Sequence, residues 1–180
     1  MDAPRTKKRL TELDRPSPVE FAATEKISLS LILDDIRSAN NVGSLFRTAD
    51  GFALRHVYLC GITATPPHRD ILKTALGATS TVSWSHHENC GTLVEGLVAA
   101  GTQVQCLEQT HGSTALSAFR VDTAQPLALV VGNEVNGVDQ SVIDRSHGTI
   151  EIEQFGTKHS LNVAVSAGIA LWALSRQLRP

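Results

Sequence analysis

From residue 27 onward, short segments that are mostly apolar alternate with segments whose apolar residues recur at helical spacing. The runs SLSLILDD (28–35) and LALVVG (127–132) have the length and apolar character of strands buried on both faces of a sheet. Strands that alternate with helices predict an α/β domain with a mainly parallel sheet and helices on both faces. The other expected strands are 56–61, 81–85, 103–108 and 149–153, and the expected helices are 42–53, 70–78, 91–101 and 160–178.

Composition indicates one folded domain in a reducing compartment. A chain of 180 residues with 42% hydrophobic residues has the size of a single domain and is too apolar to be disordered. No run approaches ~18 uninterrupted apolar residues, and the first residues lack the apolar stretch of a secretory signal, so we expect no membrane span and no secretion. The 3 cysteines include no close CxxC pair, which excludes a disulfide scaffold and a cysteine zinc site and favours a cytoplasmic location.

We expect residues 1–25 to form a flexible arm with a basic bias and residues 26–180 to form the folded domain. Pro16 and Pro18 are expected to break any helix in the arm. Such an arm is either a solvated terminus or a segment that contacts phosphate. The net charge of −2 argues against electrostatic binding of nucleic acid over the whole surface, but it is compatible with a local basic patch.

Arg47 is an unusual residue for its position in the segment RSANNVGSLFRTAD (37–50), which follows the first expected strand. Ligands of open α/β sheets bind at the carboxyl ends of strands, so the segment is well placed for a site. Arg47 lies early in a helix, where the dipole slightly disfavours a cation, and one turn from Gly43, which would leave a bare patch beside it. A guanidinium held there suits a phosphate or a developing oxyanion. The alternative is an ordinary surface pair with Asp50.

Two of the expected helices begin with polar side chains. Asn40 or Asn41 is the expected N-cap of the helix at 42–53, and Ser160 and Asn162 open the otherwise apolar helix at the C-terminus. These side chains either cap the helices or accompany backbone N–H groups that face a ligand.

The segment LALVVGNEVNGVD (127–139) has the outline of a glycine-rich nucleotide loop, because Gly132 ends an apolar strand and Gly137 follows. Glu134 stands where GxGxxG has its second glycine, and a carboxylate there would repel a pyrophosphate. A dinucleotide-dependent oxidoreductase is therefore disfavoured. The same carboxylate suits a cationic or hydroxyl-bearing ligand, and the alternative is a plain strand-to-helix turn.

Taken in this order, the three segments 37–50, 127–139 and IEQFGTKHSLNVAVSAG (152–168) resemble the SpoU/TrmH family of SPOUT RNA 2′-O-ribose methyltransferases. The residues that match its first motif are Asn41, Gly43, Arg47 and Thr48. Those that match its second motif, apolar-Gly-x-Glu-x-x-Gly, are Val131, Gly132, Glu134 and Gly137. Those that match the end of its third motif are Ser160, Leu161, Asn162 and Val163. The resemblance covers roughly residues 28–178 and departs from the family at Glu153, where a proline is frequent, and at Ala164, where a serine is common.

The resemblance implies a fold whose C-terminal segment is threaded into a deep trefoil knot, a rare exception to the rule against threaded connections. It implies S-adenosylmethionine as the methyl donor and tRNA or rRNA as the substrate. It also implies a homodimer with active sites near the interface, to which the C-terminal helix would contribute Trp172, Leu174 and Leu178. The residues that would line the donor pocket are Gly132, Ile152, Leu161, Leu107 and Glu108.

The resemblance further implies catalytic roles for five residues. We expect Arg47 to stabilise the developing alkoxide and to clamp the adjacent phosphate, because a free guanidinium is a poor base. Asn41 would orient the arginine or the ribose, and Glu134 would fix Arg47 or a substrate hydroxyl. Ser160 and Asn162 would shape the helix start and hydrogen-bond within the site.

Two other functions on the same fold stay open at this point. One is a non-catalytic RNA-binding or assembly protein that kept the pocket, and the other is an RNA methyltransferase directed at a base nitrogen. No metal site is expected, because the 7 histidines lack the spacing of metal ligands. His159, which immediately precedes Ser160, is the histidine that we most expect to touch the substrate.

Overall fold

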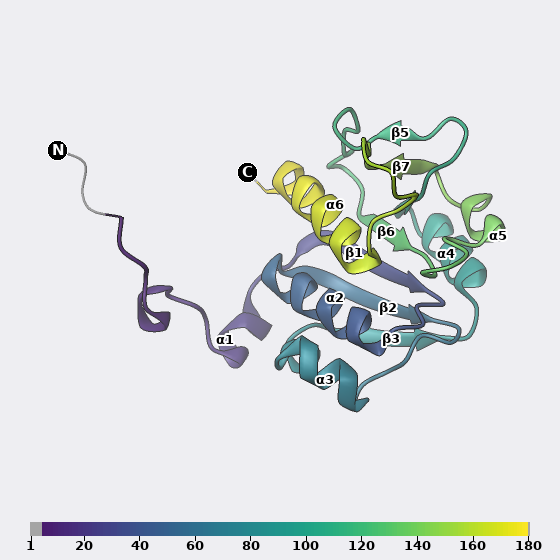
Figure 1. Ribbon diagram of the computed structural model, residues 1–180. Helices are drawn as coiled ribbons and strands as arrows, with labels where there is room; N and C mark the ends of the chain where they lie inside the picture. The colour runs from purple at the N-terminus through teal and green to yellow at the C-terminus, as the bar shows by residue number, and fades with distance from the viewer. Residues whose placement is uncertain (1–4, 180) are drawn as a thin grey trace.

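The computed structural model describes residues 5–179 and arranges them around one parallel sheet (Figure 1). The strands are β1 (Ile27–Asp34), β2 (Leu54–Cys60), β3 (Trp84–His87), β4 (Gln103–Leu107), β5 (Thr114–Ala115), β6 (Leu127–Val131) and β7 (Thr149–Glu151). Their order across the sheet is β3-β2-β1-β6-β4-β7-β5. Every pairing between these strands is parallel, as the apolar runs predicted.

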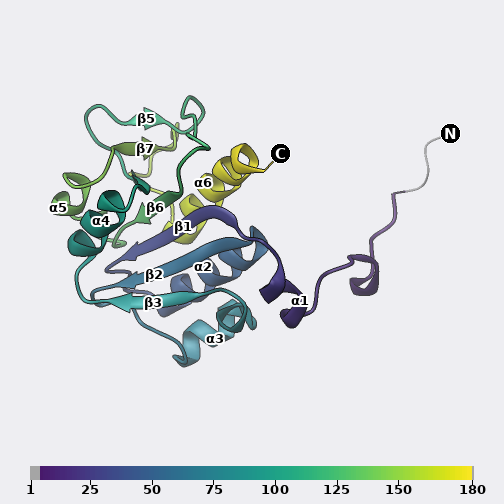
Figure 2. The same cartoon turned by 180° about the vertical axis from the view of Figure 1, so that it is seen from behind.

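Helices cover both faces of the sheet, which confirms the expected layers. They are α2 (Ala39–Gly51), α3 (Arg69–Ala75), α4 (Cys90–Ala99), α5 (Gln140–Ile143) and α6 (Val163–Leu178). Alternate residues of β1 point to opposite faces. Leu31 is buried in the core with α2, α3 and α6, whereas Ile32 is buried in the core with α4 and α5. Figures 1 and 2 show these two groups of helices on opposite sides of the central strands.

Some element bounds differ from those predicted. The third strand lies at Trp84–His87 rather than at 81–85, because a 3₁₀ turn (Ala78–Ser80) and its hydrogen bond from the Thr81 N–H occupy the chain just before it. The C-terminal helix begins at Val163 rather than at residue 160, because the Asn162 side chain caps it. The elements α5 and β5 were not expected, since segments of 4 and 2 residues are too short to show a periodicity.

The expectation that Pro16 and Pro18 break any helix in the arm was wrong. A short helix, α1 (Pro18–Ala23), begins at Pro18, and Ser17 and Glu20 form a capping box around its first turn. Proline is favoured at the first helical position, because its missing N–H has no partner there and its φ already fits. Figure 1 shows the chain before β1 leading away from the sheet, and α1 buries none of its residues.

The C-terminal helix α6 has one buried face and one exposed face, although its sequence is apolar almost all round. Leu174 is fully buried in the core of its own chain, so the expectation that it contributes to a subunit interface was wrong. Leu178 also packs against this core. The exposed apolar side chains of α6 lie at i, i+4 and i+7 and are Val165, Ile169 and Trp172. Of the three predicted interface residues, Trp172 is thus the most exposed, at 54%, whereas Leu178 is only partly exposed.

Gly43 does not leave a bare patch beside Arg47, as the sequence suggested, because it is buried where α2 crosses α3. A Cβ atom at this position would lie 2.0 Å from Thr74 Oγ1 and 2.4 Å from the Ile71 carbonyl oxygen. Thr74 Oγ1 also donates a hydrogen bond of 3.0 Å to the Asn40 carbonyl oxygen. The glycine therefore lets α3 approach the first turn of α2 closely enough for this bond to form.

We predict that Gly43→Ala destabilises the protein by about 1–3 kcal/mol, because the added methyl group must separate α2 from α3. Gly51→Ala is the matched control in the same helix, since a Cβ atom there would meet nothing within 4 Å. The control should gain up to about 1 kcal/mol from helix propensity. Urea unfolding measures both changes, and equal stabilities for the two variants would contradict the proposed contact.

Candidate functional site

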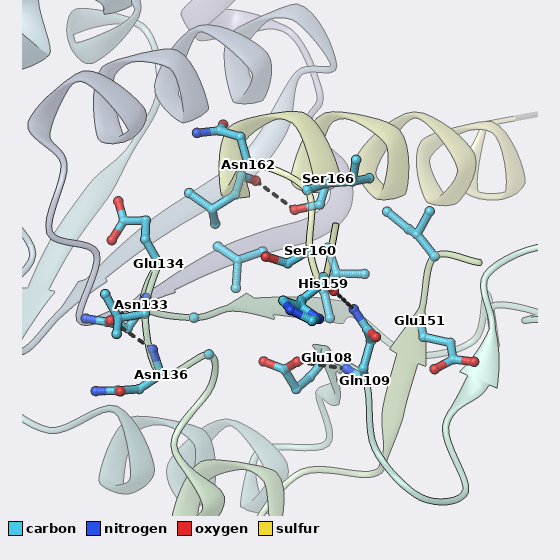
Figure 3. A pocket seen from close by; sticks show the side chains of 18 of the residues that line it. Glu108, Gln109, Asn133, Glu134, Asn136, Glu151, His159, Ser160, Asn162 and Ser166 are labelled. Carbon is cyan, nitrogen blue, oxygen red and sulfur yellow. Dashed lines mark hydrogen bonds between the residues drawn. The ribbon is translucent and has the colours of Figure 1, made fainter. Parts of the chain in front are cut away.

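A cleft of about 550 Å³ opens at the carboxyl ends of β4, β6 and β7, beside the first turn of α6 (Figure 3). Ligands of parallel sheets bind at this edge, because the loops that leave neighbouring strands meet there. Three loops line the cleft: they follow β4, β6 and β7, and the last of them leads into α6. The residues of these loops determine what the cleft can bind.

The loop after β6 turns back on itself immediately. The N–H of Asn133 donates to the Gly137 carbonyl oxygen at 3.0 Å, and the Gly137 N–H donates to the Asn133 carbonyl oxygen at 2.9 Å. A Cβ atom at Gly132 would lie 2.2 Å from both the Gly137 carbonyl carbon and the Val138 nitrogen. Glycine is therefore required at position 132. Because α5 begins only at Gln140, this segment is a closed loop rather than a plain strand-to-helix turn.

Glu134 reaches from this loop to the start of α2. Its carboxylate accepts hydrogen bonds from the Arg37 N–H at 2.9 Å, the Ser38 N–H at 3.0 Å and the Asn41 side-chain amide at 2.9 Å. Partial burial raises the pKa of Glu134, but the bonds from Arg37, Asn41 and Ser38 outweigh it and hold the pKa below its ordinary value of 4.5. Glu134 is thus a fixed anion at the N-terminus of α2, where the helix dipole favours negative charge.

The N-cap of α2 is Ser38 rather than Asn40 or Asn41, because the Ser38 side chain accepts a bond from the Asn41 N–H at 3.3 Å. The Asn41 side chain is thereby free to face the site. It donates to Glu134, and its oxygen accepts a bond of 3.3 Å from the Asn162 amide. A chain of side chains, Glu134–Asn41–Asn162, therefore joins the loop after β6 to the starts of α2 and α6.

Glu108 holds the opposite wall of the cleft. Its carboxylate accepts bonds from the Val138 N–H at 3.0 Å and the Gln109 N–H at 2.8 Å. The Gln109 side chain in turn donates to the carbonyl oxygen of His159 at 2.9 Å, and Figure 3 shows these residues side by side. The loops after β4, β6 and β7 are therefore bonded to one another around the cleft.

The cleft is negatively charged. The carboxylates among its lining residues are Glu108, Glu134 and Glu151, and no lysine or arginine is among these residues. The apolar residues of the lining include Leu107, Ile152 and Leu161. Such a surface suits a ligand with an apolar part and a positive charge.

The structure brings most of the predicted site residues to this one cleft. The expected donor-pocket residues that line it are Gly132, Ile152, Leu161, Leu107 and Glu108. The expected catalytic residues that line it are Glu134, Ser160 and Asn162, and Asn41 is bonded to two of them. His159 also lines it.

Arg47 is not among the residues that line the cleft. It lies six residues after Asn41 on α2, which places it about 9 Å further along the helix axis. There it is exposed and lines a second cavity of about 700 Å³ between α2, α3 and α6. No ion pair joins it to Asp50 within residues 5–179, and the Asp50 carboxylate accepts a bond from the Thr81 hydroxyl instead, so the alternative of an ordinary Arg47–Asp50 surface pair is not supported.

Sequence reasoning missed Asn133 and Gln109, which fix the shape of the cleft. The Asn133 side chain donates to the Asp35 carbonyl oxygen at 2.7 Å, and its oxygen accepts from the Val135 N–H at 2.9 Å. An asparagine directly after a strand is a signal for such a side-chain turn. Nothing local marks Gln109, because its partner His159 lies 50 residues away in the sequence. Within residues 5–179, no helix is both long and apolar enough to span a membrane, and no group of acidic, histidine and cysteine side chains could hold a metal ion.

We predict that Glu134→Gln lowers thermal stability at pH 7, and that this loss shrinks as the pH falls. The pKa of Glu134 is lower in the folded protein than its ordinary value of 4.5. Its stabilisation is therefore fully present above pH 4.5 and disappears as the pH falls through the lower, folded-state value. Melting curves of both proteins at pH 7 and at acidic pH test this. A difference that is constant across this range would show that the charge of Glu134 does not stabilise the fold.

Comparisons with known proteins agree with this geometry. The model of the SpoU rRNA Methylase family matches residues 28–172. The tRNA (guanosine(18)-2'-O)-methyltransferase of Escherichia coli (strain K12) is 27% identical over 159 residues, which cover 88% of this chain and 67% of that protein. An uncharacterized tRNA/rRNA methyltransferase of Archaeoglobus fulgidus is 30% identical over 169 residues, which cover 89% of this chain and 74% of that protein.

A solved structure shares both the fold and part of the sequence. The AdoMet-bound rRNA methyltransferase from Sinorhizobium meliloti has a TM-score of 0.78 and 26% identity to this chain, and the match covers 92% of this chain and 62% of that one. The family match contains all three segments whose side chains meet at the cleft. The chain belongs to the SpoU rRNA Methylase family.

Proposed function

We propose that this protein transfers a methyl group from S-adenosylmethionine to a ribose 2′-hydroxyl of tRNA or rRNA. One observation carries the proposal. Asn41 of the first motif segment lies 93 residues before Glu134 and 121 residues before Asn162, yet the chain Glu134–Asn41–Asn162 brings the three segments together at a single cleft. The named methyltransferases to which the chain is similar support the same reaction.

The cleft fits the methyl donor in size and charge. Its volume of about 550 Å³ lies within the usual range for ligand sites. Leu107, Ile152 and Leu161 provide an apolar surface for a purine ring, and the carboxylates of Glu108 and Glu134 in the lining favour a ligand with a net positive charge. When bound, the donor supplies a methyl group that its sulfonium has already activated. The protein must then align the acceptor oxygen and help to remove one proton.

Arg47 stabilises the oxygen that attacks. A ribose hydroxyl has a pKa far above neutral, so negative charge must be stabilised as its proton leaves. The guanidinium is a poor base but a strong donor of charged hydrogen bonds. Arg47 has no acidic partner within residues 5–179, so its donors are available to the alkoxide and to a neighbouring phosphate.

A second copy of the chain completes the site. Arg47 and the donor cleft lie apart on one chain, so we propose a homodimer in which Arg47 of one protomer faces the cleft of the other. The exposed stripe of Val165, Ile169 and Trp172 on α6 supports this pairing. It lies next to Gly168, which lines the same cavity as Arg47. Burial of this stripe against its symmetry mate would bring both features to the interface.

The same proposal includes three features of the chain as a whole. We propose that the C-terminal segment is threaded into a trefoil knot, which the close approach of the loops after β6 and β7 supports. We also propose that residues 1–25 are an arm separate from the methyltransferase domain at 26–180, although residues 1–4 and 180 lie outside the part that the structure describes. The protein acts in the cytoplasm, which fits the three buried, unpaired thiols of Cys60, Cys90 and Cys106.

We predict that Arg47→Ala reduces methyl transfer to RNA by on the order of a hundredfold or more, because the developing negative charge loses its stabilising cation. Affinity for the donor should change little, since Arg47 does not line the donor cleft. Incorporation of labelled methyl groups into RNA and calorimetric titration of the donor measure the two effects. Near wild-type turnover by this variant would remove Arg47 from the reaction.

We predict that two inactive variants restore activity when combined. Gly132→Val blocks the donor loop, because a side chain there collides with Gly137 and Val138. In dimers of one Gly132→Val chain and one Arg47→Ala chain, one site keeps both an intact cleft and an intact arginine. Random pairing should recover about a quarter of wild-type activity. Absence of recovery, with mixed dimers demonstrated, would place Arg47 and the donor cleft of one chain in the same site.

A further inference from the structure

The cavity that contains Arg47 holds a second cation, Lys73 of α3. The residues that line this cavity are Ser44, Arg47, Thr48, Gly51, Phe52, Lys73, Thr74, Leu76 and Gly168. No carboxylate is among them. The ion pair recorded within residues 5–179 joins Arg145 to Glu95, and neither Arg47 nor Lys73 has an acidic partner in this part of the chain. Both cations are exposed to solvent.

The hydroxyl groups of the cavity already donate to the protein. Ser44 Oγ donates to the Asn40 carbonyl oxygen at 2.9 Å, Thr48 Oγ1 to the Ser44 carbonyl oxygen at 3.0 Å, and Thr74 Oγ1 to the Asn40 carbonyl oxygen at 3.0 Å. The charged donors that remain for a ligand in this cavity are the guanidinium of Arg47 and the ammonium of Lys73. An anion bound here must therefore depend on these two groups.

Thr74, the residue after Lys73, connects α3 to the candidate site. Thr74 bonds to the carbonyl oxygen of Asn40, and the next residue, Asn41, belongs to the hydrogen-bonded chain beside the donor cleft. The contact between Gly43 and Thr74 keeps α3 against this turn of α2. Lys73 is thus held on a rigid pair of helices next to the arginine that the proposed reaction uses.

We propose that Lys73 is a positioning residue that binds, together with Arg47, a phosphate of the RNA backbone next to the target nucleotide. The inference rests on the proposed function, and it adds a residue that belongs to none of the three motif segments. Two cations that share a cavity without a carboxylate attract an anion of high charge density. The fork of Arg47 and the point charge of Lys73 are complementary phosphate ligands. Because the chain has a net charge of −2, RNA phosphates are expected to bind at local groups of cations such as this pair rather than over the whole surface.

The test compares Lys73→Ala and Lys73→Arg with Arg69→Ala, a cation one turn earlier on α3 that does not line the cavity. We expect Lys73→Ala to raise KM for RNA about fivefold to tenfold, while kcat and donor affinity stay close to wild type. Loss of one phosphate contact should also make the salt dependence of RNA affinity shallower by about 0.7–0.9 in log–log slope. In Lys73→Arg, KM for RNA and the salt slope should both stay close to wild type, and Arg69→Ala should change neither of them.

An unchanged KM and salt slope in Lys73→Ala would overturn the proposal, and so would a fall in kcat or donor affinity at constant KM. Direct binding of fluorescent total tRNA and of purified rRNA provides a readout that needs no turnover. If wild-type protein transfers no methyl group, the proposed function fails, but weaker binding and a shallower slope in Lys73→Ala would still support the phosphate site. Thermal melting excludes misfolding, and a melting loss without a change of slope counts against the proposal.

Discussion

The site depends on the hydrogen bonds that the carboxylate of Glu134 accepts from the start of α2. This carboxylate lies in a loop after the central strand β6, and it accepts two backbone N–H groups and one side-chain amide from the start of α2. These partners lie 93 to 97 residues away in the sequence. Through Asn41 the same group fixes Asn162 at the start of α6. A neutral side chain at position 134 would leave the N-terminus of α2 without its fixed anion and would weaken the link between the loop after β6 and α2.

The two cavities of this chain have opposite charge, and the proposed reaction uses both. The donor cleft contains carboxylates and no lysine or arginine, whereas the cavity between α2, α3 and α6 contains Arg47 and Lys73 and no carboxylate. Electrostatic attraction would therefore favour binding of the cationic donor in the cleft and of the anionic RNA backbone at the cavity with Arg47 and Lys73. The overall charge of −2 conceals this division, because opposite local charges nearly cancel.

Sequence patterns predicted the layers of the fold well. Strands β1 and β6 are buried on both faces of the sheet, and this burial requires the continuous apolar runs from which they were predicted. The resemblance to the SpoU/TrmH motifs implied that Glu134 and Asn162 belong to one site, and the structure joins them through Asn41. The position of Arg47 in a separate cavity was not foreseen, because it depends on where α3 and α6 pack against α2. The same packing makes Gly43, which was expected to leave a bare patch, a contact between two helices. It also brings Lys73 next to Arg47, which no local sequence pattern indicates.

A ribose 2′-oxygen is the proposed acceptor atom, and identification of the methylated nucleoside tests this assignment. RNA from a methylation-deficient strain would be incubated with isotopically labelled S-adenosylmethionine and the protein, digested with nucleases and examined by mass spectrometry. We expect a nucleoside whose label stays with the sugar after the base is removed, and a phosphodiester at that nucleotide that resists alkali. A label that leaves with the base, or no labelled nucleoside from either tRNA or rRNA, would contradict this assignment.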